Sequence, residues 1–207
     1  MRVKPMSQDA VTAMIVSRIL ELPAPWTRVA LDGAPAAAPD TWAESLAAAI
    51  RETGRTALHV RTADFLRPAS LRLEFGRSNP DSYYDGWFDL KALTREVLEP
   101  LAPGGSGRVL PTFWDPIKDR NTRSGYAELP AGSVLVLSGP LLLGARLPFD
   151  LEVHLEMSAP ALARRTPPED SWTLPAFARY AEEVGPASFA DVVIRVNDPA
   201  HPALVIR

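Results

Sequence analysis

Cysteine is absent from this chain of 207 residues, which excludes disulfides, thiolate metal sites, iron–sulfur clusters and a cysteine nucleophile. Histidine is scarce: His59, His154 and His201 lie far apart in the sequence, so we expect no histidine-based metal site. No apolar run approaches the ~18 residues of a membrane span, and the amino terminus lacks a secretory-type apolar region. We therefore expect a soluble, cytoplasmic protein that has no membrane partner.

A strong charge of either sign is also missing. The formal net charge is −3, which excludes the broad positive field of a nucleic-acid-binding protein. Lysine is rare, because only Lys4, Lys91 and Lys118 are found among 22 basic residues and the other 19 are arginines. The 21 prolines are about twice the usual ~5% share, so we expect short helices and strands joined by rigid loops.

The hydrophobic pattern predicts an α/β fold of ordinary globular composition. Strand, loop, helix and strand alternate between residues 27 and 60, which is typical of a parallel sheet. Ser7 suits an N-cap, while Pro23 and Pro25 are expected to end the first helix. Helices are predicted at 7–22, 42–50, 90–101, 159–165 and 174–184, and strands at 27–31, 57–60, 134–137, 151–155, 192–196 and, at an edge, 204–206.

We predict one three-layer α/β domain over residues 23–207, preceded by an N-terminal helix within residues 1–22. An irregular insertion occupies about 61–127, where residues 109–114 and Tyr126 are expected to flank a hairpin. The N-terminal helix is amphipathic, and it is expected to pack either on its own sheet or on another subunit. The sequence leaves a homodimer open.

Several strings, in order along residues 27–199, resemble the uridine kinase and phosphoribulokinase branch of the P-loop NTPases. Residues 29–33 resemble the strand before the phosphate loop, and 61–68 resemble the segment that carries an acceptor-activating aspartate. Residues 79–89 resemble an acceptor-side motif, and 110–119 resemble a nucleoside-contacting hairpin. Residues 134–143 resemble the strand ending in an acidic residue, and 190–199 resemble the closing strand. The resemblance implies a three-layer parallel-sheet fold, with ATP and magnesium as cofactors of the intact family.

The phosphate loop departs from the pattern G-x-x-x-x-G-K-[ST]. Counted from Gly33, the last three positions are Ala38, Pro39 and Asp40. Alanine disfavours a positive φ, proline has no N–H to donate, and the carboxylate would lie where phosphate binds. Two like charges 4 Å apart repel by about 1 kcal/mol in water and about 4 kcal/mol at an effective dielectric of 20. Ordinary ATP binding is therefore disfavoured, and Thr41 with Glu44 is predicted to cap the helix instead.

Two further positions depart from the family. Ser138 occupies the position of the acidic residue that orders the magnesium shell. The acceptor-activating aspartate aligns with Ala63, and Asp64 lies one residue later, where it would face the other way. The lysine, the magnesium ligand and the base are thus all altered, although phosphoryl transfer needs all three.

The resemblance nevertheless implies candidate site residues, each of which also has a structural interpretation. Asp64 is the candidate catalytic base or a turn-forming residue. The degenerate phosphate loop, or an ordinary proline-bearing turn, consists of Gly33, Ala38, Pro39, Asp40 and Thr41. Candidate substrate-binding residues, which packing or solvent exposure would also explain, are Arg67, Tyr83, Tyr84, Trp114, Asp115 and Arg164. No metal ligand is assigned, and His59 and His154 are expected to belong to the core.

Three functions remain open from the sequence. The first is a retired uridine kinase-like protein that binds a nucleoside, nucleotide or sugar phosphate without ordinary ATP-dependent activity. The second is an active phosphotransferase with a noncanonical donor site, for which ATP and magnesium would be the cofactors. The third is a structural or interaction protein whose old cleft is filled. Because positioned positive charge is missing, physical chemistry favours the first and third over the second.

Overall fold

The computed structural model describes residues 2–22 and 25–206. The helix-ending role predicted for Pro23, and with it the boundary between residues 1–22 and 23–207, falls outside the described residues. The helices are α1 (Gln8–Glu21), α2 (Pro39–Glu52), α3 (Ala69–Arg72), α4 (Pro80–Gly86), α5 (Leu90–Leu93), α6 (Ala159–Arg165) and α7 (Leu174–Glu183). Shorter turns of helix are η1 (Pro35–Ala37), η2 (Thr62–Phe65), η3 (Thr94–Leu98), η4 (Glu99–Leu101), η5 (Pro168–Thr173) and η6 (Pro186–Ser188).

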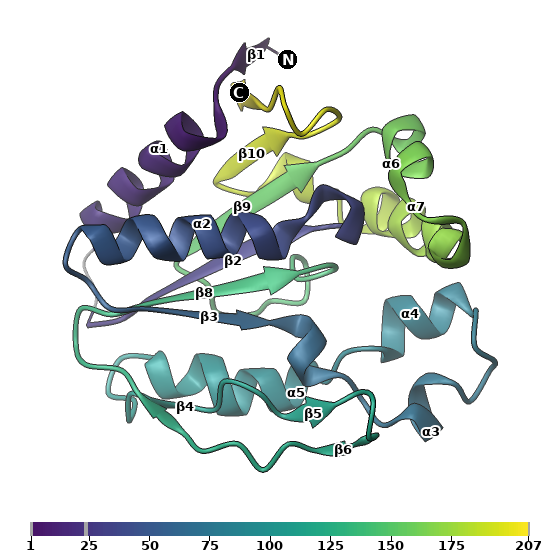
Figure 1. Cartoon of the computed structure of the whole chain (residues 1–207), viewed down its shortest axis with the longest axis horizontal. Helices are drawn as coiled ribbons and strands as arrows, with labels where there is room; N and C mark the ends of the chain where they lie inside the picture. The colour runs from purple at the N-terminus through teal and green to yellow at the C-terminus, as the bar shows by residue number, and fades with distance from the viewer. Residues whose placement is uncertain (1, 23–24, 207) are drawn as a thin grey trace.

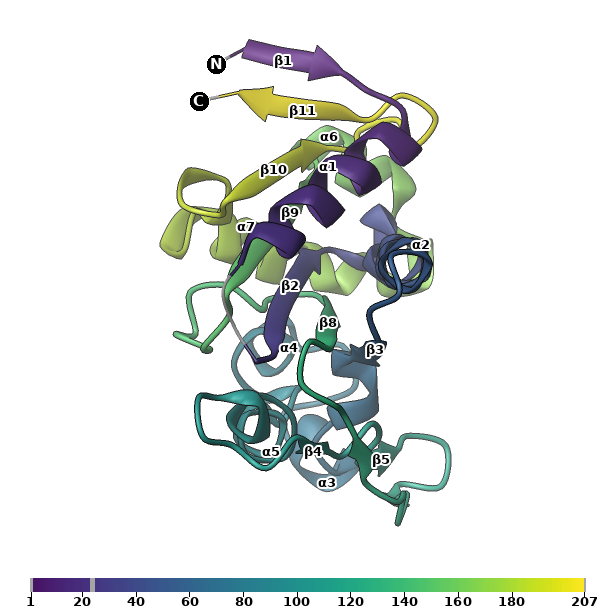
Figure 2. The same cartoon turned by 90° about the vertical axis from the view of Figure 1, so that its left-hand side faces the viewer.

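A seven-stranded sheet forms the centre, with the order β1-β11-β10-β9-β2-β8-β3. Its strands are β1 (Arg2–Pro5), β2 (Thr27–Gly33), β3 (Ala57–Arg61), β8 (Val134–Gly139), β9 (Leu151–Glu156), β10 (Val192–Arg195) and β11 (Ala203–Ile206). The five strands from β3 to β10 are parallel. Figure 2 shows β1 and β11 as antiparallel neighbours at one edge. Residues 204–206 form a strand as expected, but β11 lies one strand inside the edge, because β1, which was not predicted, pairs on its outer side.

Successive side chains of the central strands enter two different hydrophobic layers. Val29 and Leu31 of β2 pack with α1 and α2, while Ala30 between them faces the layer that contains α5 and α7. Both layers are fully buried at the sheet, since β2 and β8 expose none of their residues. The predicted three-layer α/β fold is therefore confirmed, and α1 packs on the sheet of its own chain.

Helix boundaries agree with the pattern except at the start of α2. Ser7 caps α1 as predicted, because its hydroxyl accepts the N–H of Ala10. The predicted capping box of Thr41 and Glu44 is wrong: α2 begins at Pro39, so both residues lie inside the helix. Proline is preorganised for the first helical position and needs no hydrogen-bond acceptor there, which explains the earlier start.

The region between residues 61 and 127 is less irregular than expected. It contains η2, α3 and α4, the continuous helical segment from α5 through η4, and two short antiparallel pairs. β4 (Arg108–Val109) pairs with β7 (Ala127–Glu128), and β5 (Trp114–Asp115) pairs with β6 (Arg120–Asn121). Figure 1 shows the strands of the sheet ending on the side where α4 and α7 lie. None of the described helices is long and apolar enough to cross a membrane.

Candidate functional site

The turn from β2 into α2 uses its own backbone groups to hold its shape. The N–H groups of Ala37 and Ala38 donate to the carbonyls of Ala34 and Pro35, at 2.8 and 2.9 Å. Ala38 has φ 54° and ψ 52°, the left-handed conformation that normally favours glycine. The predicted penalty at Ala38 is thus present in the folded chain, and the following Pro39 contributes no N–H group.

A chain of hydrogen bonds fixes the first charged side chain of α2. The Ser138 hydroxyl, at the end of β8, donates to Asp40 Oδ1 at 2.5 Å. His59 Nε2 lies 2.7 Å from the same hydroxyl oxygen. Because that hydroxyl has one proton and gives it to Asp40, Nε2–H of His59 donates to Ser138. Burial lowers the pKa of His59, against the opposing effect of Asp40 and Glu44, so the ring is neutral at pH 7.

A cavity of about 330 Å³ lies beside this turn, at the carboxyl ends of the strands. Parallel α/β sheets bind their ligands at this end. Asp40 is the one charged residue that lines it, and most of the wall is apolar or aromatic. The lining residues are Pro35, Ala38, Pro39, Asp40, Thr62, Ala63, Leu66, Tyr83, Trp87, Phe88, Gly139 and Pro140.

Backbone contacts hold the aromatic wall against η2. The N–H of Arg67 donates to the Trp87 carbonyl at 3.0 Å, and the N–H of Asp89 donates to the Phe65 carbonyl at 2.7 Å. Gly139 closes the opposite wall with φ 144°, and a Cβ there would collide with the side chain of Thr62. The aromatic residues and the β2–α2 turn are therefore placed by main-chain geometry.

A second cavity of about 200 Å³ shares Pro35, Tyr83 and Trp87 with the first. Its far wall comes from η5 and α7, through Trp172 and Phe177. Tyr83 separates the two cavities, and its ring lies 5.5–5.9 Å from those of Trp87, Phe88, Trp172 and Phe177. The two cavities together are called the aromatic cleft below.

The Tyr83 side chain is largely buried, but its hydroxyl stays accessible to solvent, because no fully buried polar side-chain atom of the described residues lacks a partner. The residue is only 7% exposed, yet its hydroxyl makes no hydrogen bond to any part of the chain that the structure describes. Burial raises the pKa of Tyr83, with a smaller effect from Asp170, so the hydroxyl is neutral at physiological pH. A neutral phenol can donate one hydrogen bond and accept another.

The structure brings some of the candidate loop residues into the cleft and leaves others outside. Ala38, Pro39 and Asp40 line it together with Tyr83. Thr41 is exposed on α2 and lies outside the lining. Gly33 ends β2, where an added Cβ would lie 3.0 Å from Cβ of Leu155, so its role here is close packing.

Asp64, the candidate base, lies on η2 with its carboxylate turned toward Arg61. Its two oxygens accept from Nη2 and Nε of Arg61 at 2.7 and 2.9 Å. The neighbouring Ala63 lines the cavity and Asp64 does not. Because η2 is a 3₁₀ turn with about three residues per turn, the adjacent side chains of Ala63 and Asp64 point in different directions.

Three other candidates have partners away from the cleft. Arg67 donates to the Gly86 carbonyl at 3.4 Å and lines a separate surface cavity beside α4. Tyr84 stacks under the Arg179 guanidinium, 4.2 Å from the ring centre, and its hydroxyl donates to Glu183 at 3.2 Å. Arg164 is exposed on α6. The packing interpretation fits Arg67 and Tyr84, and the solvent-exposure interpretation fits Arg164.

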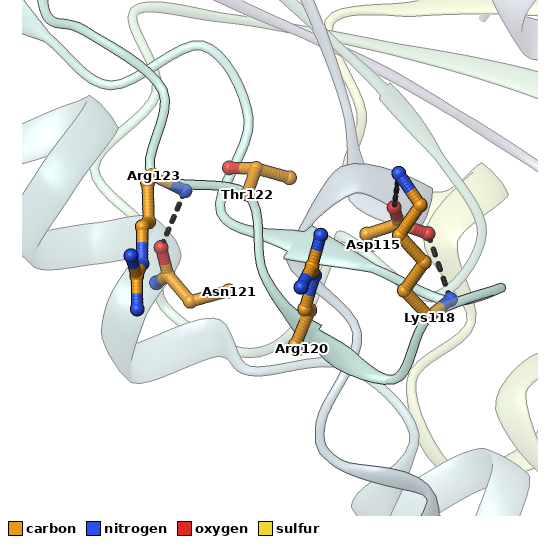
Figure 3. Close-up of a pocket in the computed structure, with 6 residues that line it drawn as sticks. All are labelled: Asp115, Lys118, Arg120, Asn121, Thr122 and Arg123. Atoms are coloured by element: carbon orange, nitrogen blue, oxygen red, sulfur yellow. Dashed lines mark hydrogen bonds and ion pairs between the residues drawn. The ribbon is translucent and has the colours of Figure 1, made fainter.

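The hairpin of β5 and β6 carries Trp114 and Asp115 on a different surface. Figure 3 shows Asp115 facing Lys118, whose N–H donates to Oδ1 at 3.1 Å and whose Nζ lies 3.8 Å from Oδ2. Trp114 donates its indole N–H to Asp119 at 3.1 Å. This hairpin lines its own cavity of about 320 Å³, with Arg120 and Arg123. The nucleoside-contacting arrangement implied for Trp114 and Asp115 is not assembled with the aromatic cleft.

Sequence reasoning missed most of the aromatic wall. Trp87, Phe88 and Trp172 line the cleft but are not among the candidate site residues of the sequence analysis. A usable signal exists, because Tyr83 and Trp87 are four residues apart and so share one face of a helix.

No family model matches the chain, and no curated protein matches it. Solved structures do match. A structure described as a possible uridine kinase from Bacillus stearothermophilus superposes with a TM-score of 0.71 and 20% identity, over 88% of this chain and 96% of that one. The chain has a uridine kinase-like fold. The YGR205w protein matches with a TM-score of 0.59 and 11% identity, over 98% of this chain and 100% of that one.

Proposed function

We propose that this protein binds a nucleoside-like small molecule in the aromatic cleft and has no ordinary ATP-dependent kinase activity. On this proposal the β2–α2 turn is a degenerate phosphate-binding loop. The observation that carries the proposal is the hydrogen bond from Ser138 to Asp40, directly after Pro39. A carboxylate and an imino acid thereby occupy the positions at which the related kinases place a hydroxyl and an amine.

Compared with the family pattern, the hydroxyl and the acid have exchanged places between the loop and β8. The hydrogen bond between them is kept, but the loop now carries the negative charge. In the family pattern the loop supplies the hydroxyl and β8 ends in the acid, whereas here Asp40 is on the loop and Ser138 ends β8. The loop carboxylate would repel a triphosphate, and no lysine offsets it. Among the described residues, no cluster of three or more His, Asp or Glu side chains is arranged to hold a metal ion. The residues present do not fit magnesium-bound ATP.

The cavity itself supports binding over the purely structural alternative. Its volume of about 330 Å³ lies within the usual range of ligand pockets, roughly 300–1,000 Å³. Pro39 is buried without filling the space, so the cleft has not closed. Aromatic walls suit a flat heterocycle, and the free hydroxyl of Tyr83 could bind a polar group on it.

Calorimetric titration with uridine, ADP and ATP–magnesium, together with an assay for ADP formation, tests this proposal. We expect binding of uridine, no heat from ATP–magnesium, and no ADP formed with uridine as acceptor. Binding of ATP–magnesium with turnover would establish the active phosphotransferase instead. Absence of binding by all three ligands would favour the structural alternative.

A back-substituted variant distinguishes the loss of phosphate binding at the turn from closure of the cleft. The triple change Ala38→Gly, Pro39→Lys and Asp40→Thr restores the family pattern at the turn. We expect it to gain ATP–magnesium binding, because the strands and helix that carry the loop are unchanged. Ala38→Gly alone is the matched control and should gain none. A triple variant that folds and still ignores nucleotides would contradict the assignment of this turn as a former phosphate loop.

A further inference from the structure

The aromatic cleft combines negative charge with aromatic surface. Asp40 is the charged residue of the first cavity and Asp170 that of the second, and neither cavity has a lysine or arginine among its lining residues. Arg72 stacks on Trp87 at 5.1 Å from the ring centre, but it lines neither cavity. The electrostatic environment inside the cleft therefore favours a cation over an anion.

Asp40 is positioned to receive such a cation. Its Oδ1 accepts the Ser138 hydroxyl, while Oδ2 has no hydrogen-bond partner among the described residues. The bond from Ser138 orients the carboxylate and leaves one oxygen for a ligand. An ammonium group beside this oxygen would form a charge-assisted hydrogen bond, and aromatic faces also attract organic cations.

The second, independent indication of a ligand is the unpartnered hydroxyl of Tyr83. It belongs to a side chain that is more than nine-tenths buried and that lines both cavities. Because the hydroxyl is accessible to solvent and has no partner among the described residues, a ligand in the cleft can hydrogen-bond to it. Tyr83 and Asp40 line the same cavity, one within the aromatic wall and the other at the β2–α2 turn.

We propose that the ligand of the aromatic cleft is an organic cation: a flat-ring compound that carries a protonated amine, with the ring among the aromatic residues and the amine at Asp40. This inference rests on the proposed function, because it names the chemical class of the ligand bound at that same site. It excludes nucleotides and sugar phosphates as ligands and gives the loop carboxylate a binding role.

Two matched ligand series test this inference by calorimetry. Uridine, 5′-amino-5′-deoxyuridine and uridine 5′-monophosphate share one ring system and differ in charge at one position. 2-Phenylethanol, 2-phenylethylamine and 2-phenylethyl phosphate form the corresponding series without a nucleoside. In at least one series we expect the amine to bind about tenfold more tightly than the alcohol, which corresponds to about 1.4 kcal/mol, and the phosphate not to bind.

Single-residue variants identify the side chain that is responsible for the preference for the amine. Asp40→Asn keeps an oxygen that can accept from Ser138 and removes the charge, so the amine and the alcohol should bind this variant with equal affinity. Glu52→Gln removes one charge from an exposed position at the far end of α2 and should leave the preference intact. Tyr83→Phe should weaken all cleft ligands several-fold, since it removes only the free hydroxyl.

The outcomes distinguish this inference from the proposed function. Tight uridine binding with no gain for the amine would overturn the inference and leave the proposed function standing. If 2-phenylethylamine binds and none of the uridine compounds does, the inference of a cationic ligand is upheld and the proposed nucleoside-like ligand is overturned. Binding of a phosphate more tightly than its alcohol, an amine preference that survives in Asp40→Asn, or silence of both series would overturn the inference.

Discussion

Ala38 shows how a single residue retains a conformation for which its side chain is unsuited. Its φ of 54° places Cβ close to the following carbonyl, which costs roughly 1–2 kcal/mol in an L-residue. The strain persists because η1 precedes it, α2 starts immediately afterwards at Pro39, and both segments are held by the sheet. The neighbouring segments therefore hold this residue in a conformation that its side chain alone disfavours.

The change Ala38→Gly should therefore stabilise the protein, by about 1 kcal/mol, because glycine adopts a positive φ without a steric cost. Urea unfolding followed by circular dichroism measures the difference. Ala48→Gly, at an exposed position inside α2, is the control and should destabilise by about 0.5–1 kcal/mol. Destabilisation by both changes would show that Ala38 is not strained.

A buried contact between Asp32 and His154 forms the second residue-level feature. Asp32 at the end of β2 is fully buried and accepts from the N–H of Leu142 at 2.9 Å, while its other oxygen lies 2.6 Å from Nδ1 of His154. The expectation that His154 belongs to the core is confirmed, with a hydrogen-bond partner, Asp32, that the sequence did not indicate. His59, expected in the core as well, is only half-buried beside the cleft.

Removing the His154 ring should expose the cost of the buried carboxylate. We expect His154→Ala to lower the free energy of unfolding by about 1–3 kcal/mol, because Asp32 would lose one hydrogen-bond partner while it remains inside the protein beside the N–H of Leu142. Chemical denaturation provides the value. His201 pairs with Asp198 at 2.7 Å on the surface, so His201→Ala should cause no measurable loss. Equal effects of the two changes would contradict this view of Asp32.

Among the elements, α4 depends on α7 for its position. A helix of seven residues is too short to be stable alone. Arg179 of α7 links the two, with Nη1 at 2.9 Å from Asp85 and 3.5 Å from Asp81 on α4, while its Nε contacts Glu183 at 2.8 Å. The aromatic cleft lies between elements that this surface network joins.

We expect Arg179→Ala to increase amide hydrogen exchange in residues 80–86 several-fold and to leave exchange in the central strands unchanged. The reason is that a short helix loses its charged connection while the sheet keeps its core. Hydrogen-exchange mass spectrometry resolves the two regions. Arg95→Ala removes an arginine that pairs with its neighbour Glu96 and serves as the control. Faster exchange throughout the chain would indicate global destabilisation instead.

The whole molecule is stabilised by two hydrophobic layers that share one sheet, and α1 belongs to one of them. Val11, Ile15 and Ile19 of α1 join the layer that contains Val29 and Leu31 of β2. The N-terminal helix therefore contributes to the same buried core as the central strands, and its removal would expose one face of the sheet.

The change Ile15→Ala should lower the stability of the whole chain by about 2–5 kcal/mol, since Ile15 is 1% exposed. Circular dichroism and tryptophan fluorescence should report one coincident transition, as expected for a single cooperative unit. Leu20→Ala on the same helix, where Leu20 is 47% exposed, should change little. Two separate transitions would mean that α1 unfolds independently.

Much of this architecture follows from local patterns. Alternating and continuous apolar runs indicated the five parallel strands, and helical spacing indicated the principal helices, because burial on a sheet imposes those periods on any chain. The absence of a lysine and of a second glycine at the β2–α2 turn is likewise visible in the residues themselves. The capping role of Ser7 could be predicted from the sequence, because it depends only on the side chain of Ser7 and the next turn of backbone.

The cleft required the tertiary structure, since its walls come from segments separated by long stretches of sequence. Asp40 and Ser138 are 98 residues apart and meet because α2 begins beside the end of β8. Tyr83 meets Trp172 only after α7 packs on α4. Local sequence determines which side chains are available and which helix or strand carries them. Long-range packing alone determined which of them share a cavity and which, such as Trp114, face another surface.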